Sequence, residues 1–193
     1  MPKIVAIYAS PRRKGNTSRL LAEAVAGARS LGAEVTEFHL RDLKISPCLE
    51  IYGCKNGGRC VIKDDFHAVS DAIFESHGLM FSSPIFFYTV SAHAKIFMDR
   101  CQSLWVKKYW IEKKSPQEKI FARKGMFISA GATRGKKLFD GATLSVRYLF
   151  DVFDMELSSS LLYRGLEFEG DVDGFPEYLE EARKAGAEFS ESL

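Results

Sequence analysis

Hydrophobic residues along this chain occur either in short continuous runs or at helical spacing, and the two patterns alternate. The run at 4–9, IVAIYA, is apolar throughout and rich in β-branched residues, which is typical of a strand buried on both faces of a parallel sheet. Between 16 and 31 the apolar residues recur every three or four positions, which predicts a helix with one buried face. That face consists of Leu20, Leu21, Ala24, Val25 and Ala28. Gly32 follows as a C-cap.

The alternation continues to the end of the chain. Four further strands are predicted at 34–40, 79–83, 126–129 and 155–163. Four further helices are predicted. The first is capped by Asp64 or Asp65, and the second is capped by Ser91. The third covers 139–153, and the fourth begins at Pro176. This order predicts an α/β fold: a doubly wound, five-stranded parallel sheet between two layers of helices.

Two segments interrupt the alternation. Residues 41–63 are irregular and contain three of the four cysteines, and loops this long inside a compact domain are usually functional. Residues 105–123 are Lys-rich, and we predict an excursion there with some helix. Because no repeat, low-complexity tract or linker separates the elements, residues 1–193 are predicted to form a single domain.

Composition and charge narrow the possible partners. The 27 Lys and Arg residues against 25 Asp and Glu give a net charge of +2, which offers no argument for nucleic-acid binding. No apolar run approaches the ~20 residues of a membrane helix. The apolar stretch 4–9 is also short for a signal peptide. We therefore expect a cytoplasmic protein without nucleic-acid or membrane partners, whose cysteines are mostly reduced.

The loop after the first strand has the chemistry of a phosphate site. It ends at a helix N-terminus, whose free N–H groups and positive dipole end favour an anion, and Gly15 permits a tight turn. The candidate side chains are Ser10, Arg12, Asn16, Thr17 and Ser18. Neither GxxxxGK[ST] nor GxGxxG is present, which argues against an NTPase or a Rossmann dinucleotide site. An ordinary helix start with solvated bases stays open as the alternative.

Two more loops lie at carboxyl ends of predicted strands, where open parallel sheets bind ligands. The loop at 83–91 carries Phe86, Phe87 and Tyr88 after a proline, and the loop at 129–135 is rich in small residues. The aromatic residues offer a flat apolar surface, although ordinary core packing would also explain them.

Three motifs together resemble a known family. They are SPRRKGNTS at 10–18, CVIKDDF at 60–66 and SSPIFFYTVSAHAKIFMDR at 82–100. In this order they resemble the NADPH-dependent FMN reductase and iron–sulfur flavoprotein families of the flavodoxin-like superfamily. The resemblance covers roughly residues 3–135. It implies a flavodoxin-like fold, FMN as cofactor and NAD(P)H as electron donor.

The resemblance also implies roles for individual residues. The FMN phosphate would be bound by Ser10, Arg12, Asn16, Thr17 and Ser18. The isoalloxazine ring would lie along Pro84, Ile85, Phe86, Phe87 and Tyr88. The other edge of the ring would touch Ser129, Ala130, Gly131 and Ala132. No catalytic side chain is implied, because hydride transfer from NAD(P)H to the ring needs no protein acid or base.

The cysteines depart from the pattern of the iron–sulfur flavoproteins. Cys48, Cys54 and Cys60 match the first, third and fourth ligand positions, whereas the second position is Ile51. Clusters normally use four thiolates, so an iron–sulfur cluster is the less favoured interpretation. Redox-active thiols or a zinc site are the alternatives. Cys101 is expected to be a packed thiol.

Two functions follow as expectations. The first is an enzyme that transfers electrons from NAD(P)H to flavin, a quinone or another small acceptor. The alternative is an electron carrier reduced by ferredoxin, with a cluster on Cys48, Cys54 and Cys60. The net charge of +2 counts against a simple carrier, because flavodoxin carriers tend to be strongly acidic. A low-molecular-weight phosphatase is excluded because no nucleophilic cysteine follows the first strand.

The resemblance further suggests a homodimer or homotetramer. Two readings of Trp105, Tyr109 and Trp110 stay open: they line the mouth of the flavin site or contact another subunit. The accompanying lysines either face solvent or meet the 2′-phosphate of NADPH or an acidic partner. They are Lys107, Lys108, Lys113, Lys114 and Lys119.

Overall fold

A computed structural model shows one parallel sheet and describes residues 1–115, 121 and 123–193. The described strands are β1 (Lys3–Tyr8), β2 (Glu34–His39), β3 (Gly78–Pro84), β4 (Arg123–Gly131) and β5 (Met155–Arg164). They pair in the order β2-β1-β3-β4-β5, with every pairing parallel. The predicted doubly wound, five-stranded parallel sheet is confirmed.

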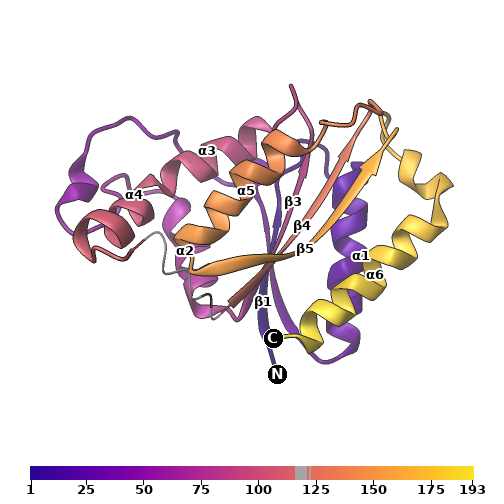
Figure 1. Cartoon of the computed structure of the whole chain (residues 1–193), viewed down its shortest axis with the longest axis horizontal. Coiled ribbons are helices and arrows are strands. Elements are labelled where there is room, and N and C mark those ends of the chain that lie inside the picture. Colours follow the sequence, from indigo (N-terminus) through magenta and orange to yellow (C-terminus); the bar gives the residue numbers. More distant parts are fainter. Residues whose placement is uncertain (116–120, 122) are drawn as a thin grey trace.

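Helices cover both faces of the sheet, as Figure 1 shows. One layer contains α1 (Asn16–Ser30) and α6 (Pro176–Glu191). The other contains α2 (Phe66–Glu75), α3 (Ala92–Arg100), α4 (Gln102–Trp105) and α5 (Asp140–Val152). The fold is therefore the predicted three-layer α/β/α arrangement. Among the described residues, no helix is long and apolar enough to cross a membrane.

Strand β1 shows why the sequence of a strand in such a sheet is apolar at consecutive positions. Val5 and Ile7 belong to the core under α2, α3 and α5, whereas Ile4 and Ala6 belong to the core under α1 and α6. Both faces are buried, so neither set of alternating positions is polar.

Helices α1 and α6 approach closely because each presents a glycine at the crossing. A Cβ atom at Gly27 would lie 1.9 Å from the carbonyl oxygen of Arg183, and one at Gly186 would lie 1.9 Å from that of Ala24. Either substitution would force the two helices apart.

The predicted caps are largely present. Ser91 Oγ accepts a hydrogen bond from the Ala94 amide at 3.2 Å, as a helix N-cap does. Gly32 follows α1 with a φ of 85°, a conformation that favours glycine. Before α2, the Asp64 carboxylate accepts from the Phe66 amide at 3.1 Å, while Asp65 accepts from the Lys44 amide at 2.6 Å.

The segment 41–63 has little regular structure, as predicted, and both of its ends are fixed to α3. It contains part of η1 (Leu40–Asp42) and all of η2 (Gly53–Lys55). The fully buried Arg100 donates hydrogen bonds to the carbonyl oxygens of Ser46 at 2.9 Å and Ile62 at 3.1 Å. Arg100 also donates to the Asp64 carboxylate at 2.6 Å. One guanidinium therefore holds the start and the end of this segment.

The segment at 105–123 contains helix at its start, in agreement with the helix predicted for part of it. After α4 the chain continues as the π-helix η3 (Val106–Ile111). Its Lys108 is buried and forms ion pairs with Asp154 at 3.0 Å and Asp151 at 3.5 Å, which fasten η3 to the turn between α5 and β5. The remainder of the predicted excursion, at 116–120 and 122 and including Lys119, lies outside the described residues.

Candidate functional site

A pocket of about 230 Å³ opens at the carboxyl edge of the sheet. It is lined by Ser10, Pro11, Arg12, Gly15, Asn16, Thr17, Pro84, Ile85, Phe86, Ala130, Gly131, Ala132, Leu166 and Glu167. These residues lie at the carboxyl ends of β3 and β4 and in the segments that follow β1, β3, β4 and β5. In the strand order β2-β1-β3-β4-β5 the direction of the connections reverses between β1 and β3, where doubly wound sheets bind ligands.

One end of the pocket is the N-terminus of α1. The first hydrogen bond that closes this helix runs from the Arg19 amide to the Gly15 carbonyl oxygen at 3.0 Å, so the amides before it lack acceptors within the helix. The loop is tightly closed, because a Cβ atom at Gly15 would lie 2.9 Å from Ser10 Oγ. This end therefore offers backbone donors and the positive end of a helix dipole.

Thr17 provides the sharpest evidence for a ligand at this end. Its side chain is buried, and among the described residues its Oγ1 has no hydrogen-bond partner. A buried hydroxyl without a partner costs about 1–3 kcal/mol. Because Thr17 lines the pocket beside free backbone amides, a phosphate oxygen would satisfy it. The residues at this end therefore fit the phosphate of FMN.

Asn16 lines the pocket, and its side chain also makes two hydrogen bonds within the chain. Its Nδ2 donates to the Phe168 carbonyl oxygen at 2.9 Å, and its Oδ1 accepts from the Val172 amide at 3.2 Å. The amide group thus fixes the connection between β5 and α6 and leaves the backbone N–H of Asn16 for a ligand. Arg12 is exposed at the rim, where Nη1 donates to the Glu167 carbonyl oxygen at 3.3 Å.

The other end of the pocket is apolar and is built from two strand ends. Pro84, Ile85 and Phe86 form one wall, and the backbone at Ala130–Ala132 forms the other. The Ile85 amide donates to the Ala130 carbonyl oxygen at 3.0 Å, which fixes the two walls relative to each other. A slot with small residues on one side and an aromatic residue at its mouth suits a flat ring system.

Phe87 and Tyr88 do not line this pocket. Phe86 and Thr89 exchange two backbone hydrogen bonds, at 2.9 and 3.0 Å, around a two-residue turn formed by Phe87 and Tyr88. Phe87 is fully exposed to solvent, and Tyr88 is half-exposed. The structure therefore places the Phe86 side chain at the pocket and turns the chain away after it.

Two other predicted residues do not line the pocket but form hydrogen bonds to the backbone next to it. Ser129 Oγ donates to the Ser83 carbonyl oxygen at 2.7 Å, and Ser18 Oγ donates to the Arg12 carbonyl oxygen at 3.1 Å. Ten of the fourteen predicted residues line the pocket, and the four that do not are Ser18, Phe87, Tyr88 and Ser129.

Leu166 and Glu167 line the pocket and were missed from the sequence. They follow the carboxyl end of β5, so the rule that ligands lie beyond strand ends would have indicated them. Trp105, Tyr109 and Trp110 are absent from the lining and pack on one another instead, with Trp105 ring centroids 5.5 and 5.4 Å from those of the other two.

The cysteines do not form a cluster site in the described part of the chain. Cys48 is exposed, Cys54 and Cys60 are half-buried, and all are free thiols. Across residues 1–115, 121 and 123–193, no three His, Cys, Asp or Glu side chains are grouped so that they could hold a metal. Ile51, at the second ligand position, is exposed. This donor set does not fit a four-iron cluster.

Cys101 is a packed thiol, as predicted. It is buried where α3 ends, and burial raises the pKa of its thiol well above the ordinary value. A thiol that stays protonated in an apolar setting is a poor metal ligand and a poor nucleophile.

The curated relatives of this chain include several iron–sulfur flavoproteins. One from Methanocaldococcus jannaschii is 36% identical over 102 residues, which cover 53% of this chain and 53% of the relative. Another from Archaeoglobus fulgidus is 34% identical over 131 residues, which cover 68% of this chain and 63% of the relative. The chain thus spans roughly half to two thirds of the length of these relatives.

Solved structures share the fold of this chain, and a family comparison matches the part of the sequence that carries the motifs. A flavone reductase superposes with a TM-score of 0.71 at 19% identity, covering 98% of this chain and 62% of that chain. An archaeal flavodoxin superposes with a TM-score of 0.58 at 13% identity, covering 98% of this chain and 97% of that one. The NADPH-dependent FMN reductase family matches residues 2–156, and the chain belongs to that family.

Proposed function

We propose that this chain binds FMN in the pocket and transfers electrons from NAD(P)H to flavin, a quinone or another small acceptor. The observation that carries the proposal is Thr17, a buried hydroxyl that has no hydrogen-bond partner among the described residues. It lies at a helix N-terminus, in a pocket whose far end is apolar. FMN, when bound, supplies the ability to accept a hydride and to release electrons singly or in pairs. The family to which the chain belongs supports the same cofactor.

The residues of the chain then bind, orient and shield the cofactor. Thr17 and the amides of the first turn of α1 hold the phosphate, and the Arg12 guanidinium adds charge at the rim. Pro84, Ile85 and Phe86 exclude water from one side of the ring. Within the part of the chain that the structure describes, Arg12 and Glu167 are the only titratable side chains that line the pocket, so the protein contributes position rather than acid–base chemistry.

NAD(P)H is proposed as the donor in preference to ferredoxin. The carrier alternative routes electrons through a cluster on Cys48, Cys54 and Cys60, and the donor set in the described residues does not fit one. A pocket open at the carboxyl edge of the sheet instead leaves room for a diffusible donor at the ring end. Ferredoxin as a partner and assembly into a homodimer or homotetramer stay predictions.

Thr17→Val tests the proposal directly. The substitution keeps the shape and removes the hydroxyl, so FMN affinity should fall by about tenfold or more, the usual worth of a hydrogen bond to a charged group. The FMN-free protein should be as stable as before or more stable, because no protein hydrogen bond is lost. FMN fluorescence titration gives the affinity and urea unfolding gives the stability.

Thr36→Val is the matched control, since Thr36 is exposed on the edge strand β2. It should leave FMN affinity unchanged. If Thr17→Val bound FMN as tightly as the unmodified protein, or if it destabilised the FMN-free protein, the assignment of Thr17 to the phosphate would be wrong.

A further inference from the structure

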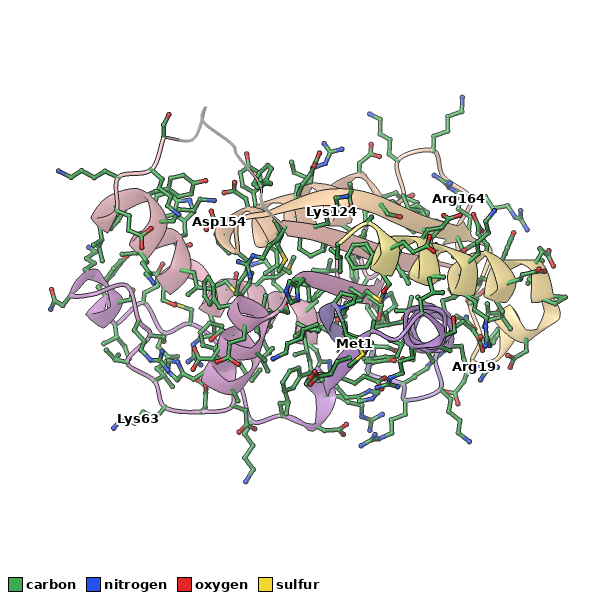
Figure 2. All side chains as sticks on the ribbon, turned by 90° about the horizontal axis from the view of Figure 1, so that it is seen from below. Met1, Arg19, Lys63, Lys124, Asp154 and Arg164 are labelled. Carbon is green, nitrogen blue, oxygen red and sulfur yellow. The ribbon has the colours of Figure 1, made fainter. Side chains whose placement is uncertain are left out.

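The connection between β5 and α6 begins beside the apolar end of the pocket. The amides of Gly165 and Leu166 both donate to the Gly131 carbonyl oxygen, at 2.8 and 3.3 Å, and Gly131 belongs to one wall of that end. Figure 2 shows Arg164, the last residue of β5, on the same side of the molecule as Arg19 of α1. The connection therefore starts at the ring end of the site, on the side of the molecule where α1 begins.

The same connection reaches the phosphate end within three residues. The Glu167 carbonyl oxygen accepts from Arg12 Nη1 at 3.3 Å, and the Phe168 carbonyl oxygen accepts from Asn16 Nδ2 at 2.9 Å. Both donors belong to the loop at the start of α1 and line the pocket. Glu167 thus lies between Leu166, which is bonded to the wall of the ring end, and Phe168, which is bonded to the phosphate end. It borders the middle of the pocket.

The backbone around Glu167 is held in a defined conformation. Asp171 Oδ2 accepts from the amides of Glu167 and Phe168, at 2.7 and 2.8 Å. Further along the connection, Asp173 forms an ion pair with Arg19 of α1 at 3.1 Å. A side chain on a backbone fixed in this way loses less conformational entropy when it binds a ligand than one on a mobile loop.

The Glu167 carboxylate is a hydrogen-bond acceptor without a donor in the described part of the chain. Its side chain lines the pocket, is exposed, and forms no ion pair or hydrogen bond with any described residue. A carboxylate accepts hydrogen bonds and repels a phosphate, so it suits an uncharged group that donates. The other polar side chains of the lining have roles already: Thr17 and Arg12 face the phosphate, and Asn16 holds the connection.

We propose that Glu167 accepts hydrogen bonds from the ribityl hydroxyls of FMN and makes the site selective for flavins that carry the ribityl chain. The inference rests on the proposed function. The ribityl chain joins the ring to the phosphate, so it occupies the part of the pocket between the apolar end and the start of α1, which Glu167 borders. Its hydroxyls are uncharged donors. A site that binds a hydroxyl through a fixed acceptor discriminates strongly against an analogue that lacks the hydroxyl.

Binding of riboflavin and of lumiflavin to the FMN-free protein isolates the ribityl chain. The two probes share the ring system and lack the phosphate, and riboflavin carries the ribityl chain where lumiflavin has a methyl group. Fluorescence titration should show riboflavin bound about tenfold tighter than lumiflavin, and Glu167→Leu should reduce this ratio to within about twofold. Glu167→Gln keeps an acceptor oxygen, so it should reduce the ratio less than Glu167→Leu does.

Two further variants separate the ribityl contact from general effects. Glu169→Leu is the matched control: Glu169 is also exposed, lies two positions further along, and is not among the described residues that line the pocket. It should leave the ratio of riboflavin to lumiflavin affinity unchanged. Thr17→Val should instead reduce the ratio of FMN to riboflavin affinity, because its hydroxyl is assigned to the phosphate. Urea unfolding should give equal stability for Glu167→Leu and the unmodified FMN-free protein, because the carboxylate has no contact to lose in the described chain.

The inference and the proposed function fail in different ways. If the unmodified protein binds riboflavin and lumiflavin equally, or if the difference survives Glu167→Leu, the inference is wrong, while FMN binding and the proposed function stand. An equal loss of affinity in Glu169→Leu would also overturn it, because the effect would then belong to the charge of the segment. A protein that binds none of the three flavins would overturn the proposed function, and the inference with it.

Discussion

Phe87 and Tyr88 occupy backbone conformations that side chains usually avoid. Their φ angles are 49° and 61°, consecutive positive values that place both residues in the left-handed region. Two-residue hairpin turns with this geometry normally use Asn or Gly. Any other residue at one of these positions lowers the stability of the fold by about 1 kcal/mol. The strained turn lies beside the pocket and directly follows Phe86, which lines the pocket.

Phe87→Asn should therefore stabilise the protein. The side chain of Phe87 is fully exposed, so no packing is lost, and Asn tolerates the left-handed conformation. We expect the free energy of unfolding to rise by about 1 kcal/mol in urea denaturation. Phe87→Ala removes the same ring without relieving the backbone and should leave stability unchanged, whereas an equal gain in both variants would show that the strain argument is wrong.

For single residues, the sequence predicted which residues lie at the site better than it predicted what each side chain contacts there. Thr17 and Gly15 could be placed in the phosphate loop because a helix start after a strand has a recognisable pattern. The engagement of the Asn16 side chain with Phe168 and Val172 could not be predicted, because it depends on where a segment about 150 positions further along the chain lies. The turn at Phe87 was hidden because its residues carry none of the usual turn signals.

Among the secondary-structure elements, α3 is linked to the loop that precedes α2 by a buried ion pair between Arg100 and Asp64. The Arg100 side chain is fully buried and the Asp64 side chain is 12% exposed, with 2.6 Å between nitrogen and oxygen. Burial raises the pKa of the Asp64 carboxyl, but the hydrogen bonds from Arg100 and from two backbone amides outweigh it. The pKa of Asp64 is therefore lowered from its ordinary 3.8.

This shift sets the sign of a pH dependence. Because the carboxyl pKa is lower in the folded than in the unfolded chain, its contribution to stability is complete above about pH 3.8 and is lost as pH falls through the folded-state value. Asp64→Asn should lower the free energy of unfolding at pH 7 by about 3 kcal/mol, since it leaves Arg100 buried without a counter-charge. It should also remove this part of the acid sensitivity, measured by urea unfolding from pH 7 to pH 3.

Asp99→Asn is the control for this pair. Asp99 pairs with Lys95 at the same 2.6 Å, but both side chains are about half exposed. Its loss should cost less than about 0.5 kcal/mol. If the two substitutions lowered the free energy of unfolding equally, burial could not be the reason why the Arg100–Asp64 pair contributes more to stability than the Lys95–Asp99 pair.

The cysteine segment makes a separate prediction at this scale. Ile51 occupies the position at which the resembled motif has its second cysteine, and its side chain is exposed. Anaerobic reconstitution with iron and sulfide should therefore load Ile51→Cys but not the unmodified protein or Ile51→Ser. Iron and acid-labile sulfide assays measure this, and stoichiometric iron in the unmodified protein would show that three cysteines suffice.

The order and type of the elements could be predicted because local pattern and burial agree along most of the chain. The strands are continuous apolar runs because both faces of the sheet are covered, and β1 shows this position by position. The segment 106–111 was harder because its helix depends on burying Lys108 against two aspartates some 45 residues later. A lysine is normally predicted to face solvent from the local sequence alone, because lysines are seldom fully buried.

The whole molecule places its site by topology. The strand order puts the ends of β1, β3 and β4 next to one another, so three loops that are distant in sequence meet at one edge. Figure 1 shows both chain termini together at the opposite, amino edge of the sheet. The rule for open sheets was sufficient to predict this edge from the sequence, whereas the contribution of Leu166 and Glu167 after β5 became visible only in the folded structure.

An anaerobic spectroscopic titration tests the central claim most directly. The FMN-free protein is titrated with FMN and then, once loaded, with NADPH and separately with NADH. The account predicts saturation at one FMN per chain and bleaching of the flavin absorption by at least one of the two nucleotides. A protein that binds no added FMN would contradict the account.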